Sequence, residues 1–296
     1  MILDNKTFNE SKIRIARAAL HMWEEPCISG ENGSGTVFFT GCNLKCVFCQ
    51  NYVISRGKVG HNISVSELAE TMLSLQEQKA NNINLVTAGH FLKPVVQAVE
   101  SARNQGLTIP IVYNTSSYEP VDNIKRLEGI VNVYLPDLKY VSSDLSLRYS
   151  GKADYFDVAS LAIKEMVRQT KDVRFTDEQS HSLILGVDDY QDRCEDESLI
   201  MTRGTIVRHL LLPGCLCDSK AVVKQLIEIF GDDIFISIMN QYTPLEHVKE
   251  LCPELYKKTE SSDYETLLDY AIELGLNNGF FQDGDVALES FIPDFN

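Results

Sequence analysis

Short apolar runs recur along the chain and alternate with longer segments that have apolar residues on one side. The runs are rich in β-branched and aromatic residues, which is typical of buried strands. This pattern predicts six strands, at residues 36–40, 83–87, 109–114, 131–135, 205–212 and 234–239, followed by an extended segment at 279–282.

The intervening segments have the spacing of apolar positions that indicates amphipathic helices. Helices are predicted at residues 11–22, 64–78, 94–106, 121–127, 156–169, 220–230 and 264–274. The clearest start signal is the segment Ser64 to Glu67, a capping box that begins the second of these helices. In the first predicted helix, Ile13, Ala16 and Leu20 form the apolar stripe.

About six alternations of strand and helix favour parallel strands with helices outside, in a barrel, a partial barrel or a doubly wound sheet. No glycine-rich phosphate motif follows the first strand, which counts against a nucleotide-binding doubly wound fold. In a barrel, the catalytic residues lie where strands end and loops begin. Residues 176–198 interrupt the alternation with an acidic, poorly periodic stretch, and we expect a surface excursion there.

Composition narrows the choice of partner and compartment. Hydrophobic residues make up 44% of the 296 residues, enough for a sizeable core in one large domain or two. The net charge of −15 argues against nucleic acid or an anionic membrane as a partner, since both require clustered Lys and Arg. The sequence shows no signal core and no apolar run of membrane-spanning length, so we expect a cytoplasmic protein without a membrane partner.

Three of the eight cysteines lie together in "TGCNLKCVFCQN", at Cys42, Cys46 and Cys49, directly after the first predicted strand. Their spacing also suits one face of a helix, where they would be small core residues. A zinc site would need a fourth ligand from elsewhere, such as Cys27 or His61. An iron–sulfur cubane held by three thiolates would leave one iron open to an added ligand. In a reducing cytosol, metal binding is favoured over disulfides.

The Cys-x-x-x-Cys-x-x-Cys loop after a first strand, with Phe48 before the last cysteine, resembles the radical S-adenosylmethionine (SAM) superfamily. The segment from Glu24 to Ser55 resembles proteins related to the pyruvate formate-lyase activating enzyme, and "YLPDLKY", "VRHLLLPG" and "IMNQYTP" match later segments of that group. The resemblance implies an α/β fold, a partial (β/α)6 TIM-like barrel of the radical SAM type. It also implies a single radical SAM domain over residues 1–296, with an N-terminal helical extension at about 1–34 and the acidic excursion at about 176–198.

The resemblance further implies the chemistry. Cys42, Cys46 and Cys49 would hold a [4Fe-4S] cluster, and SAM would bind its open iron. One electron, from a donor such as flavodoxin or ferredoxin, would cleave SAM to a 5′-deoxyadenosyl radical that takes hydrogen from a protein or peptide, for example a glycyl-radical enzyme. The alternatives are a radical SAM enzyme that acts on a small molecule or RNA, and a non-catalytic iron–sulfur or zinc protein. The acidic charge makes RNA the less attractive substrate.

Cofactor-binding positions follow from the same resemblance. Phe48 would lie near the adenine. Where the superfamily has a Gly-Gly-Glu segment for the SAM amino group, this chain has "TAGH", so we assign Thr87, Ala88 and Gly89 to cofactor binding, with backbone carbonyls or the Thr87 hydroxyl as acceptors. His90, the last residue of this segment, is expected to be structural.

Three polar residues at strand ends complete the predicted site. Asn114 would reach the SAM ribose or the substrate, and Lys139 the SAM carboxylate, unless Lys139 simply pairs with Asp137. Arg208 and His209 alternate on the fifth strand, so only one can face the interior. Burying an unpaired Arg is costly, so Arg208 is expected to meet a carboxylate or a ligand. Lys139 and Arg208 are the candidate catalytic residues, whereas Cys215 and Cys217 are expected to be ordinary thiols.

Overall fold

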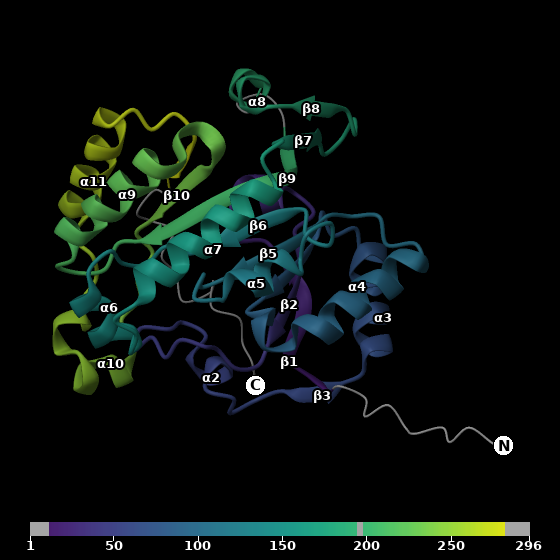
Figure 1. Cartoon of the computed structure of the whole chain (residues 1–296), viewed down its shortest axis with the longest axis horizontal. Coiled ribbons are helices and arrows are strands. Elements are labelled where there is room, and N and C mark those ends of the chain that lie inside the picture. The colour runs from purple at the N-terminus through teal and green to yellow at the C-terminus, as the bar shows by residue number, and fades with distance from the viewer. Residues whose placement is uncertain (1–11, 194–197, 282–296) are drawn as a thin grey trace.

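The computed structural model describes residues 12–193 and 198–281, and these form one open, twisted sheet with helices packed against it (Figure 1). The strand order is β11-β10-β9-β6-β5-β4-β2-β1-β3. Within it, β2, β4, β5, β6, β9, β10 and β11 pair in parallel. In the part of the chain that the structure describes, the edge strands β11 and β3 do not pair with each other, so the sheet stays open. The predicted partial barrel is therefore confirmed.

The strands occupy the following ranges: β1 (Ile13–His21), β2 (Ser34–Phe39), β3 (His61–Ile63), β4 (Ile83–Val86), β5 (Ile111–Thr115), β6 (Val133–Pro136), β7 (Arg174–Asp177), β8 (Leu183–Leu185), β9 (Leu199–Leu210), β10 (Phe235–Met239) and β11 (Gly279–Phe281). The helices are α1 (Pro26–Ser29), α2 (Tyr52–Ser55), α3 (Val65–Glu77), α4 (Leu92–Asn104), α5 (Val121–Lys125), α6 (Ser143–Ser150), α7 (Tyr155–Gln169), α8 (Val187–Arg193), α9 (Leu216–Phe230), α10 (Glu246–Leu251) and α11 (Ser261–Glu273). All six predicted strands are present, and β11 adds a parallel strand at the edge.

Two large apolar cores lie between the sheet and its outer helices. One contains side chains of β1, β2, β4 and β5 packed against α3 and α4. The other joins β9 and β10 to α7, α9 and α11. The parallel strands are buried on both faces, which explains why their sequences are continuous apolar runs rather than alternating ones.

The helix predicted at residues 11–22 is wrong. From Ile13 to His21 the chain is strand β1, which runs antiparallel to β2 and β3. Ile13 and Ile15 are buried and point to one side, as alternate residues of a strand do. The alanine-rich segment has good helix propensity, but pairing with two strands overrides that weak preference. The N-terminal extension is thus not helical over this strand, and residues 1–11 lie outside the described part.

The capping box at the start of α3 is confirmed. The Ser64 side chain accepts a hydrogen bond from the Glu67 backbone N–H at 3.2 Å, and Glu67 Oε2 accepts one from the Ser64 backbone N–H at 2.7 Å. Both bonds satisfy backbone donors that a helix start leaves without partners.

Replacing Ser64 with alanine is therefore expected to lower the free energy of unfolding by about 1 kcal/mol. The measurement is the midpoint of denaturant unfolding. The matched control is Ser66→Ala, an exposed serine two residues further on, in the first turn of α3, whose hydroxyl bonds only Glu70. If both variants unfold at the same midpoint, the capping contribution is absent.

The acidic excursion shares an apolar core with the sheet, because Phe175 and Ile184 pack in one cluster with Val112 and Val133. The β7–β8 hairpin and α8 stand out from one end of the sheet (Figure 1). Tyr190 of α8 stacks on Phe175 of β7 with ring centroids 4.3 Å apart. Glu178 accepts hydrogen bonds from the backbone N–H groups of Glu31 and Asn32 and from the side chain of Asn81. These bonds tie the excursion to the loop before β2.

Candidate functional site

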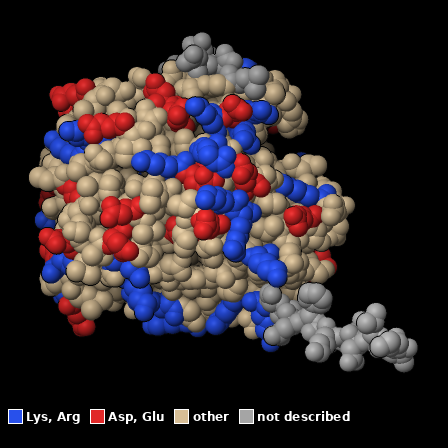
Figure 2. All heavy atoms as spheres, viewed as in Figure 1, with Lys and Arg blue, Asp and Glu red and all other residues tan. Residues whose placement is uncertain are grey.

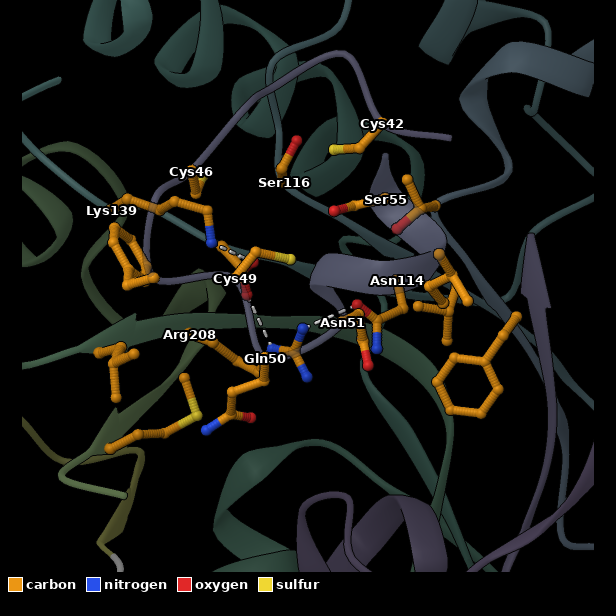
Figure 3. Close-up of a pocket in the computed structure, with 18 of the residues that line it drawn as sticks. Cys42, Cys46, Cys49, Gln50, Asn51, Ser55, Asn114, Ser116, Lys139 and Arg208 are labelled. Carbon is orange, nitrogen blue, oxygen red and sulfur yellow. Dashed lines mark hydrogen bonds and ion pairs between the residues drawn. The ribbon is translucent and has the colours of Figure 1, made fainter. Parts of the chain in front are cut away.

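A cavity of about 270 Å³ opens where the parallel strands end, beside the three-cysteine loop (Figure 3). Its walls come from the loop after β2 and from the ends of β4, β5, β6 and β9. Most of the predicted site residues line it: Cys42, Cys46, Phe48, Cys49, Thr87, Asn114, Lys139 and Arg208. Residues from five separate segments therefore meet at the position that the barrel fold assigns to catalysis.

The cysteine loop is held in place by backbone hydrogen bonds at its start and in its middle. Gly41 begins it with φ of 101°, a left-handed conformation that favours glycine, and its N–H donates to the carbonyl of Ile54 in α2. The N–H of Val47 donates to the carbonyl of Tyr149 in α6 at 2.8 Å. The loop is irregular rather than helical, so the three cysteines are not one face of a helix.

The three thiols surround the cavity without converging on one point (Figure 3). Burial raises the pKa of Cys42 to about 12 and also raises the pKa of Cys49, while the Lys139 charge opposes both shifts. Cys46 Sγ lies 3.0 Å from the Ser150 hydroxyl. Buried thiols become thiolates only when a strong cation compensates the cost, which is what a metal centre provides.

Three thiols are a donor set that suits an iron–sulfur cluster, because a cubane gives each thiolate its own iron. Cys27 and His61, the possible fourth ligands of a zinc site, do not line this cavity; Cys27 is buried in a different core.

Arg208 lies at the centre of a buried polar network on the cavity floor. Its guanidinium donates to Asp137 Oδ1 at 3.0 Å, to Glu24 Oε2 at 3.1 Å and to Asn114 Oδ1 at 2.7 Å. The predicted meeting of Arg208 with a carboxylate is confirmed. The neighbouring His209 points the other way: its Nδ1 lies 2.9 Å from the carbonyl of Leu138, and burial lowers its pKa to about 4. Only Arg208 faces the cavity, as the strand alternation predicts.

Lys139 continues the network. Its Nζ lies 2.7 Å from Asp137 Oδ2, so Asp137 bridges Lys139 and Arg208. Burial would raise the pKa of Asp137, but the two cations outweigh it and hold the pKa below its ordinary value. Lys139 thus pairs with Asp137 and also lines the cavity, so the two roles considered for it are compatible.

Two acidic residues enter the cavity from the segment between β1 and α1. Glu24 accepts from the side chains of Asn84 at 3.0 Å and of Asn114 at 3.4 Å, besides its ion pair with Arg208. Glu25 is 3% exposed. Burial raises the pKa of both carboxyl groups, and Arg208 opposes the shift.

The "TAGH" segment is only partly at the cavity. Thr87 lines it and has φ of 61°, a left-handed conformation that is unusual for a β-branched residue. Ala88 is fully buried in the first core, and a side chain added at Gly89 would meet Glu119 at 2.8 Å. Neither Ala88 nor Gly89 lines the cavity, so their proposed part in cofactor binding depends on their backbone atoms.

The remaining predicted residues have simpler positions. Phe48 is buried and contacts Tyr140 and Tyr242 edge-on, with one side at the cavity. His90 does not line the cavity. Cys217 is exposed, and Cys215 is partly buried near the carbonyl of Pro213. Neither cysteine lines the cavity.

The sequence interpretation missed Glu24 and Glu25 as site residues. Two adjacent acidic residues before a proline are typical of a solvent-exposed turn, and the neighbouring sequence does not indicate that they are buried. The signal that could have found them is Arg208, whose charge in an apolar strand requires more than one acceptor. Gln50, Ser55 and Ser116 also line the cavity without having been predicted as site residues.

Comparison with known proteins agrees with this geometry. The model of the radical SAM superfamily matches residues 36–198, more than half of the chain. The uncharacterized protein MJ0674 of Methanocaldococcus jannaschii is 27% identical over 264 residues, which is 87% of this chain and 67% of that protein.

Two solved structures share the fold at low identity. HydG, a maturase of the [FeFe]-hydrogenase, has a TM-score of 0.51 and 12% identity, covering 81% of this chain and 48% of its own. Methylornithine synthase (PylB) has a TM-score of 0.50 and 12% identity, covering 81% of this chain and 61% of its own. The chain thus spans about half to three fifths of these structures. The chain belongs to the radical SAM superfamily, whose cofactors are a [4Fe-4S] cluster and S-adenosylmethionine.

Proposed function

We propose that this radical SAM enzyme abstracts a hydrogen atom from a protein or peptide substrate, as the activating enzymes of glycyl-radical proteins do. When bound, the cluster supplies one electron that cleaves SAM to methionine and a 5′-deoxyadenosyl radical, the species that takes the hydrogen atom. The observation that carries the proposal is that three thiols, one buried and two partly buried, line the same cavity as a polar network of matched charges. An electron donor such as flavodoxin or ferredoxin and a cytoplasmic location complete the proposal.

The thiol side of the cavity has the donor set for the cluster. Cys42, Cys46 and Cys49 are the proposed ligands, and the positive charge of Lys139 stabilises their thiolate forms. Backbone hydrogen bonds at Gly41 and Val47 fix the path of the loop that carries these three residues. Such preorganisation reduces the entropy lost when the cluster binds.

The polar side of the cavity has complementary groups for the amino acid part of SAM. Lys139 and Arg208 are cations suited to a carboxylate, and Glu24 and Asn114 are acceptors suited to an ammonium or hydroxyl group. Asp137 holds both cations in position through two ion pairs. Lys139 and Arg208 are therefore proposed to orient the cofactor, and Phe48 and Thr87 to contact it.

The surface charge fits this proposal better than a nucleic-acid substrate. The net charge is −15, and acidic and basic side chains are mixed over the face shown in Figure 2. Among the described residues, no helix has the length and apolar character needed to cross a bilayer.

The direct test is anaerobic reconstitution with iron and sulfide, followed by reduction with dithionite in the presence of SAM. We expect 5′-deoxyadenosine and methionine in equal amounts. A spectroscopic change of the cluster on adding SAM should precede the cleavage. If the protein binds iron but neither responds to SAM nor cleaves it, it is a non-catalytic iron–sulfur protein and the proposal is wrong.

A further inference from the structure

A second cavity of about 280 Å³ adjoins the first at β10 and the edge strand β11. Trp23, Glu24, Glu25 and Gln241 line both cavities, so the two share a wall. The rest of the lining comes from the segment after β1 and from these two strands, at Met22, Pro26, Ser237, Gly279, Phe280 and Phe281. A molecule in the second cavity would thus lie next to the proposed reaction site.

The inner end of this cavity has two buried oxygen groups that lie beside each other. Glu25 is 3% exposed and Ser237 is fully buried. The Ser237 hydroxyl lies beside the Glu25 carboxyl, and neither Glu25 Oε2 nor Ser237 Oγ has a further hydrogen-bond partner among the residues described. An unsatisfied buried polar atom costs free energy, and a native protein keeps such atoms mainly where a ligand or water completes them.

The charges around the shared wall point to a cation as that ligand. Three carboxyl groups, of Glu24, Glu25 and Asp137, lie near two cations, Arg208 and Lys139. The ion pairs in the described structure join Arg208 to Glu24 and Asp137, and Lys139 to Asp137. Glu25 is the acid left without an ion pair in that set. A positively charged ligand would supply the missing partner.

The outer end of the cavity is apolar and partly open. Trp23 is 53% exposed, Phe281 46% and Met22 42%, which makes three large apolar side chains accessible in one place. Aromatic rings bind both alkyl chains and cations on their faces. The cavity therefore suits a ligand with an apolar stem and a charged nitrogen at its tip.

We propose that the second cavity binds a lysine side chain of the peptide substrate, with the ammonium at Glu25 and Ser237 and the stem against Trp23 and Phe281. A compact ammonium matches one free carboxylate oxygen and one hydroxyl better than the five-donor guanidinium does. The inference rests on the proposed function, because it names the class of residue that positions the substrate beside the cofactor.

The test uses the reconstituted, SAM-loaded protein and two acetylated, amidated tripeptides, Gly-Lys-Gly and Gly-norleucine-Gly. Calorimetry gives the affinity, and fluorescence reports the place of binding, because Trp23 is the only tryptophan of the chain. We expect saturable binding of the lysine peptide with a change in Trp23 emission, and at least about tenfold weaker binding of the norleucine peptide. Equal affinity for both peptides would overturn the inference.

Substitutions at Glu25 and Ser237 test whether the lysine ammonium binds at these two residues. Glu25→Gln keeps the shape of the side chain but removes its charge. We expect it to reduce the affinity for the lysine peptide at least about tenfold and to leave the affinity for the norleucine peptide unchanged. The matched control is Glu100→Gln, an exposed acid of α4, which should bind as the wild type does. Should Glu25→Gln fail to fold, Ser237→Ala provides the second variant, with the same discrimination between peptides expected.

Two experimental outcomes distinguish the lysine site from the proposed radical chemistry. A wild-type protein that cleaves SAM but does not prefer the lysine peptide overturns the lysine site and leaves the radical chemistry intact. A protein that binds the lysine peptide at Trp23 but never cleaves SAM supports the site and overturns the catalytic role.

Discussion

Replacing Cys49 with alanine is expected to reduce the iron of the reconstituted protein from about four atoms per chain to well below one, and to abolish 5′-deoxyadenosine formation. Two remaining thiolates cannot hold a cubane against competing thiols in solution. The measurements are iron and sulfide content, the visible absorption of the cluster, and nucleoside production after reduction with SAM.

The matched control is Cys217→Ala, which removes an exposed thiol that does not line the cavity. It should retain the iron content and the SAM cleavage of the wild type. If Cys217→Ala loses the cluster while Cys49→Ala keeps it, the three-cysteine loop is not the metal site.

Replacing Arg208 with methionine is expected to lower the free energy of unfolding by about 3 to 5 kcal/mol at pH 8. Arg208 is the cation that joins Glu24, Asp137 and Asn114. Without it, Glu24 is left buried and without an ion-pair partner in the described structure, and Asp137 keeps only Lys139. SAM cleavage should be lost as well, because the proposed carboxylate partner of the cofactor is gone.

The loss of unfolding free energy caused by Arg208→Met should become smaller as the pH is lowered. Burial already raises the pKa of Glu24, and loss of the Arg208 charge removes an effect that opposes this rise. The folded variant then binds more protons than its unfolded chain does, so its stability increases as the pH falls through the raised pKa. Denaturant unfolding of the variant and wild type at pH 8 and pH 5 measures the difference.

Arg168→Met is the control for this charge loss. Arg168 also pairs with two carboxylates, Glu165 and Glu128, but its side chain is 54% exposed, so its removal should cost less than about 1 kcal/mol. Equal destabilisation by the two variants would mean that burial of the Arg208 network has no energetic consequence.

The sequence predicted best what depends on local residues. Cys42, Cys46 and Cys49 lie within eight residues of one another, so their spacing alone indicates a shared centre. The strand ends that carry Asn114 and Arg208 could be located because parallel strands are continuous apolar runs. Once the strands are placed, the fold brings these side chains to one edge without further information.

The sequence predicted worst what depends on pairing between distant segments. Strand β1 looks helical because its register with β2 and β3 is not encoded in its own propensity. Glu24 and Glu25 follow β1, so their burial depends on where that strand leads the chain. A segment predicted as a helix could not reveal that Glu24 forms an ion pair with Arg208.

The second cavity has walls from opposite ends of the chain, Met22 to Pro26 on one side and Gly279 to Phe281 on the other. During synthesis from the N-terminus, the cysteine loop leaves the ribosome more than 200 residues before the last wall strand does. The three thiols are therefore synthesised long before the last wall of the second cavity exists. A chain that ended before β11 would keep the cysteine loop but lack the wall formed by Gly279 to Phe281.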